Sequence, residues 1–263
     1  MRKIGISFNA MEGLSSEVYA KTIADLGFEA TFTGVPGTPE RMSELGNAFA
    51  ANGVAWETMH APYKNINQMW LEGEGGEAMH ASLLHGVDAC HAAGVPILVV
   101  HLSLGLKPPS ITDLGRARFT ALVEHALANG VQIAFENQRK LANIARTFEA
   151  FEDAPNVGFC WDTGHENCFS PGRQYMPLFG KKLICTHIHD NNGEFNNDEH
   201  LLPFDGKLDF DRAARQIRES GFTGSLMLEA IAANSHRYDG MTCEAYLERA
   251  AVAAKRLRDM VDG

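Results

Sequence analysis

The chain has 263 residues, of which 45% are hydrophobic and 21% are charged, and its formal net charge is -10. These values are typical of a soluble globular protein, and the length suits one domain spanning residues 1–263. Nucleic-acid binding depends on basic side chains that neutralise phosphates, so the acidic balance and the lack of any Lys/Arg cluster argue against a DNA-binding or RNA-binding protein. The composition favours chemistry on a small molecule.

The cysteines form no CxxC pair, and they are Cys90, Cys160, Cys168, Cys185 and Cys243. Their odd number, and the apolar segments around three of them, indicate reduced thiols and therefore a cytoplasmic protein. No apolar run approaches the roughly 20 residues of a membrane span. The first residues, MRKIGISFNA, lack the long apolar core of a signal peptide. We expect no association with a membrane.

A recurring phrase predicts the architecture. Glycine ends a helix-like segment and an apolar run follows directly in LGFEATF, NGVAWETMH, AGVPILVVHL, NGVQIAFE and SGFTGSLMLE. Glycine accepts the left-handed conformation that ends a helix, and the run after it is typical of a buried parallel strand. Counting such runs along the chain gives eight strands, at residues 3–8, 28–33, 54–60, 96–102, 131–136, 157–162, 183–189 and 225–230.

Amphipathic segments alternate with these strands. Their apolar residues recur every three or four positions, as helices packed on a sheet require. These segments cover residues 15–27, 38–53, 76–94, 111–130 and 209–221, and a last one covers 243–261. The helix expected within 163–181 is the least regular, because Pro171, Gly172 and Pro177 interrupt it. Eight alternating strands and helices predict an α/β fold, a (β/α)8 barrel. The sequence has no GxGxxG or GxxxxGK[ST] motif, so we expect no nucleotide cofactor.

Each of the last four predicted strands closes on a possible metal ligand. VQIAFE ends in Glu136, VGFCWD in Asp162, KLICTHIH in His189 and GSLMLE in Glu229. The carboxyl ends of barrel strands converge on one face, so we expect these side chains to meet in one mouth. A buried carboxylate without a charge partner is costly, and carboxylates together with imidazole bind divalent cations. The pattern predicts a site for one divalent ion.

Further polar residues lie at or just beyond other strand ends. His60 in TMHAPY and His101 in VVHLSLG end the third and fourth strands, where each is either a hydrogen-bonded barrel histidine or a ligand. His165 stands in WDTGH, and His200 follows Asp198 in a loop. We expect these loop residues to contact a substrate.

Three polar residues follow the fifth strand directly. They are Asn137, Gln138 and Arg139. One interpretation is that they orient hydroxyl or acidic groups of a substrate. The other is that they cap the following helix, as polar side chains often do.

With these residues assembled, the chain resembles the xylose isomerase-like superfamily, the sugar phosphate isomerase/epimerase group that also includes endonuclease IV. The matching motifs are MHAP at 59–62, HLSLG at 101–105, FEN at 135–137, WDTGH at 161–165, HIHDN at 187–191, DEHLLPFDGKLDF at 198–210 and LEA at 228–230. Each motif is short, but they occur in the family's order over nearly the whole chain.

The resemblance implies a (β/α)8 fold with one divalent metal, commonly manganese, magnesium or zinc. It assigns the metal to Glu136, Asp162, His189 and Glu229, and the two glutamates would also exchange a proton with the substrate. His189 is the second histidine of the HxH motif, which matches the ligand position. His187 is the alternative ligand.

The resemblance also covers the other histidines. Two match positions that contact substrate oxygens, His165 and His200, and two match pocket residues, His60 and His101. Ketose 3-epimerases carry a further Glu six residues after the strand-five ligand and an Arg six residues after the strand-seven His, where this chain has Ala142 and Phe195. These differences argue against that subfamily, and no Arg/Lys cluster marks a sugar-phosphate clamp.

Two classes of function follow. The first hypothesis is a metal-dependent isomerase or epimerase of a small sugar or keto-sugar, in which Glu136 and Glu229 move a proton through an enediolate. A keto-sugar or keto-inositol dehydratase shares the same opening step. We expect a small sugar-like substrate and no nucleic-acid partner, and a homo-oligomer is compatible with the sequence.

The alternative is an endonuclease IV-like zinc phosphodiesterase with a multinuclear site. The chain supplies ligand types at all the positions that such a site would use: His60, His101, Glu136, Asp162, His165, His189, Asp198, His200 and Glu229.

Overall fold

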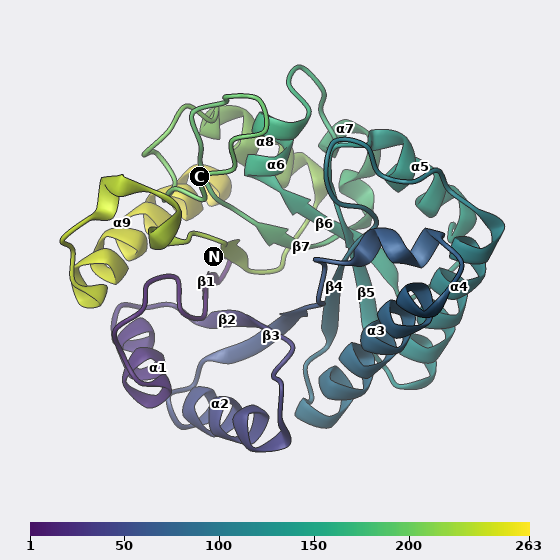
Figure 1. Ribbon diagram of the computed structural model, residues 1–263. Coiled ribbons are helices and arrows are strands. Elements are labelled where there is room, and N and C mark those ends of the chain that lie inside the picture. The colour runs from purple at the N-terminus through teal and green to yellow at the C-terminus, as the bar shows by residue number, and fades with distance from the viewer.

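A computed structural model describes residues 1–263, and its strands lie at the centre of a ring of helices (Figure 1). The parallel strands are β1 (Ile4–Ser7), β2 (Ala30–Gly34), β3 (Ala55–His60), β4 (Ile97–His101), β5 (Gln132–Glu136), β6 (Val157–Asp162), β7 (Leu183–His187) and β8 (Leu226–Leu228). Each predicted strand is present, and the (β/α)8 barrel is confirmed.

The helices around the barrel follow the strands in chain order. They are α1 (Ser16–Asp25), α2 (Pro39–Ala51), α3 (Glu74–Ala93), α4 (Asp113–Ala128), α5 (Leu141–Ala150), α6 (Thr163–Phe169), α7 (Met176–Phe179), α8 (Phe210–Ser220) and α9 (Cys243–Asp262). Short 3-10 helices are η1 (Ile66–Trp70), η2 (Gly180–Lys182), η3 (Ala232–Asn234) and η4 (His236–Tyr238). None of the helices has the length and hydropathy needed to cross a bilayer.

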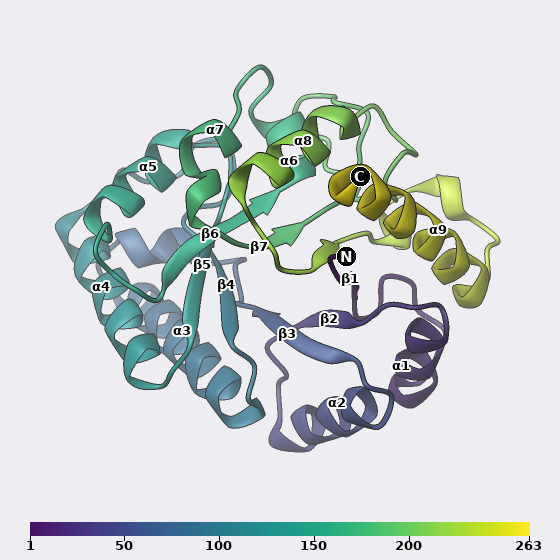
Figure 2. The same cartoon turned by 180° about the vertical axis from the view of Figure 1, so that it is seen from behind.

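Backbone hydrogen bonds close the sheet into a barrel. The strand order is β7-β6-β5-β4-β3-β2-β1-β8, so β1 pairs with both β2 and β8. Ile188 bridges the remaining gap between β7 and β8. Its N–H donates to the carbonyl of Met227 at 2.8 Å, and its carbonyl accepts from the N–H of Glu229 at 3.0 Å. The first helix, α1, lies next to the last helix, α9, in both views (Figures 1 and 2).

The local signals that predicted the helices have structural counterparts. The side chain before each of α1, α2, α4, α8 and α9 accepts a hydrogen bond from the first turn, as an N-cap does. Gly94 and Gly221 follow α3 and α8 with φ of 67° and 79°, the left-handed conformation expected at these ends.

Three segments differ from the sequence-based expectation. The irregular helix expected within 163–181 is two short helices, α6 and α7, with Pro171 and Gly172 in the break between them. The helix α5 buries Ile144, Thr147 and Phe148, although the periodicity analysis did not single it out. The strand β7 ends at residue 187, two residues earlier than predicted, which changes the histidine that lies at its end.

Two layers of packing hold the strands. Their outer faces pack against the helices in a cluster of 62 buried residues. A separate small cluster consists of Ile97, Val99, Ala134, Cys160 and Cys185. Side chains alternate along a strand, so the residues two positions further, at the strand ends, face the same side. The small cluster therefore forms an apolar floor beneath the polar strand ends.

The loops after β3 and β4 are cross-linked into a wall beside the barrel mouth. The amide of Asn67 exchanges two hydrogen bonds with the backbone of Leu104, at 2.8 and 2.9 Å. The Trp70 indole N–H donates to the carbonyl of Leu102 at 2.7 Å. The buried guanidinium of Arg118 donates to three carbonyls in and next to η1, at 2.7, 3.0 and 3.3 Å. These bonds fix the wall.

Replacing Arg118 by Met tests this wall. The variant keeps much of the volume but leaves three carbonyls without their donor, so we expect the free energy of unfolding to fall by about 2–4 kcal/mol. Urea denaturation measures this change. Arg116→Met is the matched control on the same helix, because its side chain is 63% exposed, and it should change stability by less than about 0.5 kcal/mol. Equal, small effects of the two substitutions would contradict the role of Arg118.

Candidate active site

A cavity of about 990 Å³ opens at the carboxyl ends of the strands. This face carries the functional site in (β/α)8 enzymes, because strand ends from the whole chain converge there. Most of the predicted site residues line it: His60, His101, Glu136, Arg139, His165, Asp198, His200 and Glu229.

Four donors meet at the base of this cavity and are called the four-residue group. Glu136, Asp162, His187 and Glu229 each offer a ligand atom within 4.8 Å of the others. The expected set is corrected at one position, because His187 takes the place that we predicted for His189. The β6–β7 register pairs Asp162 with His187, so the two lie at the same level of the barrel.

A second group joins the first through a shared carboxylate. His60 and His101 have their Nε2 atoms 3.2 Å apart, and each Nε2 lies 3.3 Å from Oε2 of Glu136. The Nδ1 atom of His60 lies 2.8 Å from the carbonyl of Ala61, which accepts a hydrogen bond and so requires a proton on Nδ1. In the neutral ring of His60, the lone pair of Nε2 then faces His101 and Glu136.

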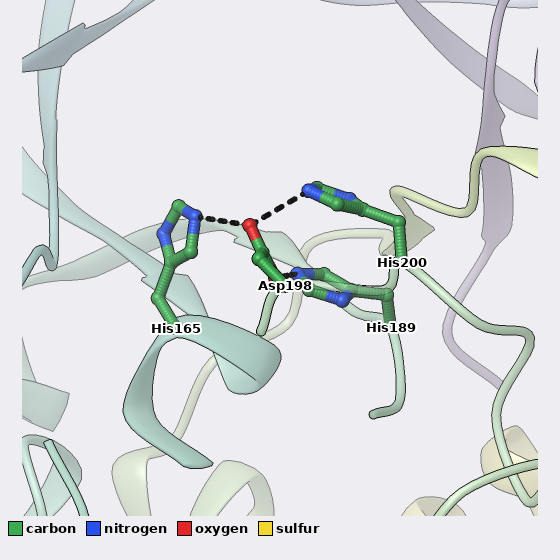
Figure 3. A group of neighbouring side chains, drawn as sticks. All are labelled: His165, His189, Asp198 and His200. Atoms are coloured by element: carbon green, nitrogen blue, oxygen red, sulfur yellow. Dashed lines mark hydrogen bonds and ion pairs between the residues drawn. The ribbon is translucent and has the colours of Figure 1, made fainter. Parts of the chain in front are cut away.

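A third group lies beyond the strand ends (Figure 3). It consists of His165, His189, Asp198 and His200. Oδ2 of Asp198 lies 3.2 Å from Nε2 of His165 and 3.0 Å from Nε2 of His200. The rings of His189 and His200 stack with centroids 3.9 Å apart. Nε2 of His189 also lies 3.0 Å from Oδ1 of Asp162, which connects this group to the four-residue group.

The loop that carries Asp198 and His200 of the third group is held in a strained conformation. His200 has φ of 47°, a left-handed value that costs a non-glycine residue of order 1–3 kcal/mol. Its Nδ1 donates to the carbonyl of Glu229 at 2.8 Å, which turns Nε2 toward Asp198. The buried carboxylate of Asp190 anchors the loop by accepting from the N–H groups of Gly206 and Leu208 at 2.8 and 2.9 Å. The sequence analysis did not identify Asp190.

Two neighbouring polar residues after β5 have different roles in the structure. Asn137 is not in the cavity lining, because its amide donates to the carbonyl of Asp162 and accepts from its N–H, both at 2.8 Å. The predicted substrate contact of Asn137 is therefore replaced by a positioning role. Gln138, for which the sequence left substrate contact and helix capping open, lines the cavity with Nε2 at 3.0 Å from His165 Nδ1 and 3.3 Å from His101 Nε2. The sequence feature that indicated this role was the position of Gln138, two residues after Glu136 at the end of β5.

Arg139 lies at the rim of the cavity. Its guanidinium stacks 3.5 Å from the ring centroid of Phe169, and its Nε and Nη2 atoms donate to Oδ1 of Asn196 at 2.8 and 2.6 Å. These contacts fix the orientation of the one arginine that faces the cavity.

The imidazoles keep the buried carboxylates ionised. Burial opposes ionisation of Glu136, but His101 and the histidines next to it hold its pKa well below the ordinary value. The same balance applies to Glu229, where burial is outweighed by His187 and the pKa is again lowered. Both glutamates are therefore charged at neutral pH.

The carboxylates have the opposite effect on the histidines. Burial lowers the pKa of each buried imidazole, but Asp162 and Asp198 raise the pKa of His165 well above its ordinary value. For His187 the glutamates do the same. The pKa of His200 is raised to about 9, because its contact with Asp198 outweighs burial.

Several buried nitrogens in this site have no hydrogen-bond partner. Both ring nitrogens of His187 are in this state, as are Nδ1 of His101 and Nδ1 of His189. Nδ1 of His187 lies 3.3 Å from Glu136 and 3.2 Å from Glu229 without making a hydrogen bond to either. Buried polar atoms are rarely left unpaired, and carboxylates with imidazole suit ions such as zinc or manganese. The residues of the site fit a divalent cation.

The corrected ligand set leads to a direct test. In protein loaded with one equivalent of manganese or zinc and then dialysed, His187→Ala should lose the ion, because it removes one of four donors. His189→Ala should retain it, because His189 is outside the four-residue group. Elemental analysis of the dialysed proteins measures both. Retention by His187→Ala together with loss by His189→Ala would return the ligand role to His189.

Metal binding should also release protons. Metal ligation requires neutral imidazole, and although burial lowers the pKa of His187, Glu229 and Glu136 hold it well above its ordinary value in the metal-free protein. Affinity should therefore increase with pH, and titration calorimetry in buffers of different ionisation enthalpy should detect the released protons.

The raised pKa of His200 predicts how the metal-free fold responds to pH. The folded-state pKa of His200, about 9, is above the unfolded value of about 6.5. Its contribution to the free energy of unfolding is therefore complete below about pH 6.5 and is lost as the pH rises through about 9. Proton uptake on metal binding, or metal-free stability that rises over this range, would contradict these assignments.

Comparison with known proteins agrees with this fold. The sequence profile of the xylose isomerase-like TIM barrel family matches residues 20–258, so the chain belongs to this family. The uncharacterized protein y4fM of Sinorhizobium fredii is 32% identical over 193 residues, which cover 68% of this chain and 60% of y4fM. The inosose dehydratase of Lacticaseibacillus casei is 24% identical over 86% of this chain and 87% of that enzyme. The match spans 63% of a further uncharacterized relative, from Methanocaldococcus jannaschii.

Solved structures of sugar epimerases share the fold. D-psicose 3-epimerase from Clostridium cellulolyticum has a TM-score of 0.79 at 18% identity, over 98% of this chain and 99% of that chain. The 3-keto-D-glucoside 4-epimerase YcjR from E. coli has a TM-score of 0.77 at 18% identity, over 98% of this chain and 100% of that chain.

Proposed function

We propose that the protein is a divalent-metal-dependent isomerase or epimerase that acts on a small sugar or keto-sugar by proton transfer through an enediolate. The observation that carries this proposal is the four-residue group, in which two ionised glutamates from β5 and β8 converge with Asp162 and His187 at the base of an open cavity. Family membership, two sugar epimerases of the same fold and a related inosose dehydratase support this class of reaction.

The chemistry is divided between the group and its surroundings. A divalent ion held by the four residues would polarise a carbonyl and a neighbouring hydroxyl of the substrate. Glu229 is the better placed of the two bases, because its side chain is 12% exposed whereas that of Glu136 is 1% exposed. We assign the proton transfer at the substrate carbon to Glu229 first and to Glu136 second. Burial of Glu229 is outweighed by His187, which keeps this carboxylate unprotonated at neutral pH, as a general base must be before the transfer.

The residues around the cavity suit a polyhydroxylated ring. His165 and His200 carry protonated imidazoles whose Nε2 atoms both contact Asp198, and we assign them to substrate oxygens that would take the place of this carboxylate contact. The ring centroid of Tyr63 lies 5.3 Å from that of His60 and 4.8 Å from that of His101. Tyr63 lines the cavity and adds an aromatic surface to it. A keto-sugar or keto-inositol dehydratase would use the same opening step, and either imidazolium could then protonate the departing hydroxyl.

One observation favours a second candidate, the zinc phosphodiesterase. The structure gathers the predicted donors, with His187 as the strand-seven ligand, into three adjacent groups. Two of them share Glu136, and His165 of the third contacts it at 2.8 Å. Multinuclear sites of this kind clamp the oxygens of a phosphate during hydrolysis. The charge argues against a nucleic-acid substrate. The chain carries a net charge of -10, and Lys64 and Arg139 are the two basic side chains other than histidine that line the cavity.

Isotope exchange tests the leading proposal without knowledge of the product. A panel of ketoses, keto-acids and keto-inositols is incubated in deuterated buffer with manganese or magnesium, and NMR follows the C–H next to the carbonyl. The wild type should exchange it. Glu229→Gln should lose about 100-fold or more of the rate, since it removes a positioned base, while the exposed loop variant Glu194→Gln should keep it.

The number of ions separates the two candidates. Metal analysis of the purified protein should find one ion per chain for the isomerase or epimerase. Two or three zinc ions, together with cleavage of an abasic DNA duplex and no exchange in any carbonyl compound, would replace this proposal by the phosphodiesterase.

A further inference from the structure

One donor at the floor of the site has no role in the chemistry described above, and it is the thiol of Cys160. This residue lies on β6 two positions before Asp162, so both side chains face the barrel interior. The strand register pairs Cys160 with Glu136 on β5. Its sulfur and the nearest ligand atoms of Glu136 and His187 all lie within 4.8 Å of one another, and the three residues are buried.

His187 supplies an independent indication that this point binds an ion. Both of its ring nitrogens are buried and lack a hydrogen-bond partner. The ring is fixed in place by stacking on Phe32, with centroids 4.7 Å apart and planes 20° apart. An imidazole held rigidly beside carboxylates and a thiol, with ring nitrogens that make no hydrogen bond to them, has the arrangement of a metal ligand.

We propose that Cys160 is a further donor to the ion held by Glu136 and His187. On binding, the S–H bond breaks, the proton passes to solvent, and a sulfur lone pair forms the bond to the ion. Thiolate prefers zinc, iron(II) and cobalt to the harder magnesium and manganese ions. The proposal therefore makes the site selective for the softer divalent metals, and it rests on the metal site of the proposed function.

The surroundings of the sulfur support this assignment. Cys160 packs with Ile97, Val99 and Ala134 in the apolar floor, where its side chain is fully buried. Cys185 on the neighbouring strand lies beside it in register and belongs to the same apolar floor. However, Cys185 joins none of the donor groups, so it is a matched control for the effect of losing one buried thiol.

Cobalt substitution tests the proposal by a readout that does not depend on activity. Metal-free protein takes up one equivalent of Co²⁺, and its near-ultraviolet spectrum is recorded. The wild type and Cys185→Ser should show a thiolate-to-cobalt charge-transfer band, and Cys160→Ser should lose it. Competition titrations should also show that Cys160→Ser reduces the preference for zinc over manganese by about tenfold or more.

A measurement on the wild type decides the question even if Cys160→Ser does not fold. X-ray absorption of the protein with one equivalent of zinc should show a sulfur neighbour at about 2.3 Å. A zinc shell of nitrogen and oxygen alone, a cobalt complex without the band, or a band that persists in Cys160→Ser overturns the role of Cys160 and leaves the proposed function standing. Failure of the wild type to bind either ion overturns the metal basis of the proposed function as well.

Discussion

Negative charge buried at the mouth of the barrel is the constraint on which the rest of this structure depends. Glu136, Asp162, Asp198 and Glu229 come from different strands and loops and converge on one small volume. Carboxylates withdrawn from water are stable as ions when cations or hydrogen-bond donors face them. Six histidines provide that compensation here: His60, His101, His165, His187, His189 and His200. The unpartnered nitrogens that remain are the reason to place metal in the site.

The second feature is the precision with which surrounding residues position these donors. Asn137 ties the end of β5 to the backbone of Asp162, and Asp190 anchors the loop that carries Asp198 and His200. The left-handed backbone of His200 is strain that such anchors must hold in place. These anchors hold the donors on loops as precisely in place as the donors on strands. Metal binding and proton transfer both require such fixed positions.

The arrangement also explains why one barrel is compatible with different reactions. Glu136 belongs to both the four-residue group and the pair of His60 and His101, and the third group lies one contact away. One ion at the four-residue group would leave the outer histidines free to bond a substrate. Additional ions at the outer groups would make the same side chains ligands. On the proposed function, the chemistry would depend on metal occupancy as well as on the identity of the residues, and fold alone does not decide it.

The sequence by itself determined the architecture and the candidate donors. Repeated glycine-ended helices and apolar runs specify eight strands, because these signals are local, and each strand-end carboxylate follows from its own strand. Tertiary structure decided which donors meet. His187 and His189 are equivalent in a two-residue pattern, and the end of β7 with its register to Asp162 selects His187 for the four-residue group. Asn137 and Gln138 are adjacent polar residues in sequence, yet one faces a backbone and the other the cavity. The sequence around Cys160 predicts an ordinary core residue, and only the pairing of β5 with β6 shows that it lies beside Glu136. No local sequence signal marks a contact between strands that are far apart in the chain. These contacts are set by the register in which the strands pair when the barrel closes.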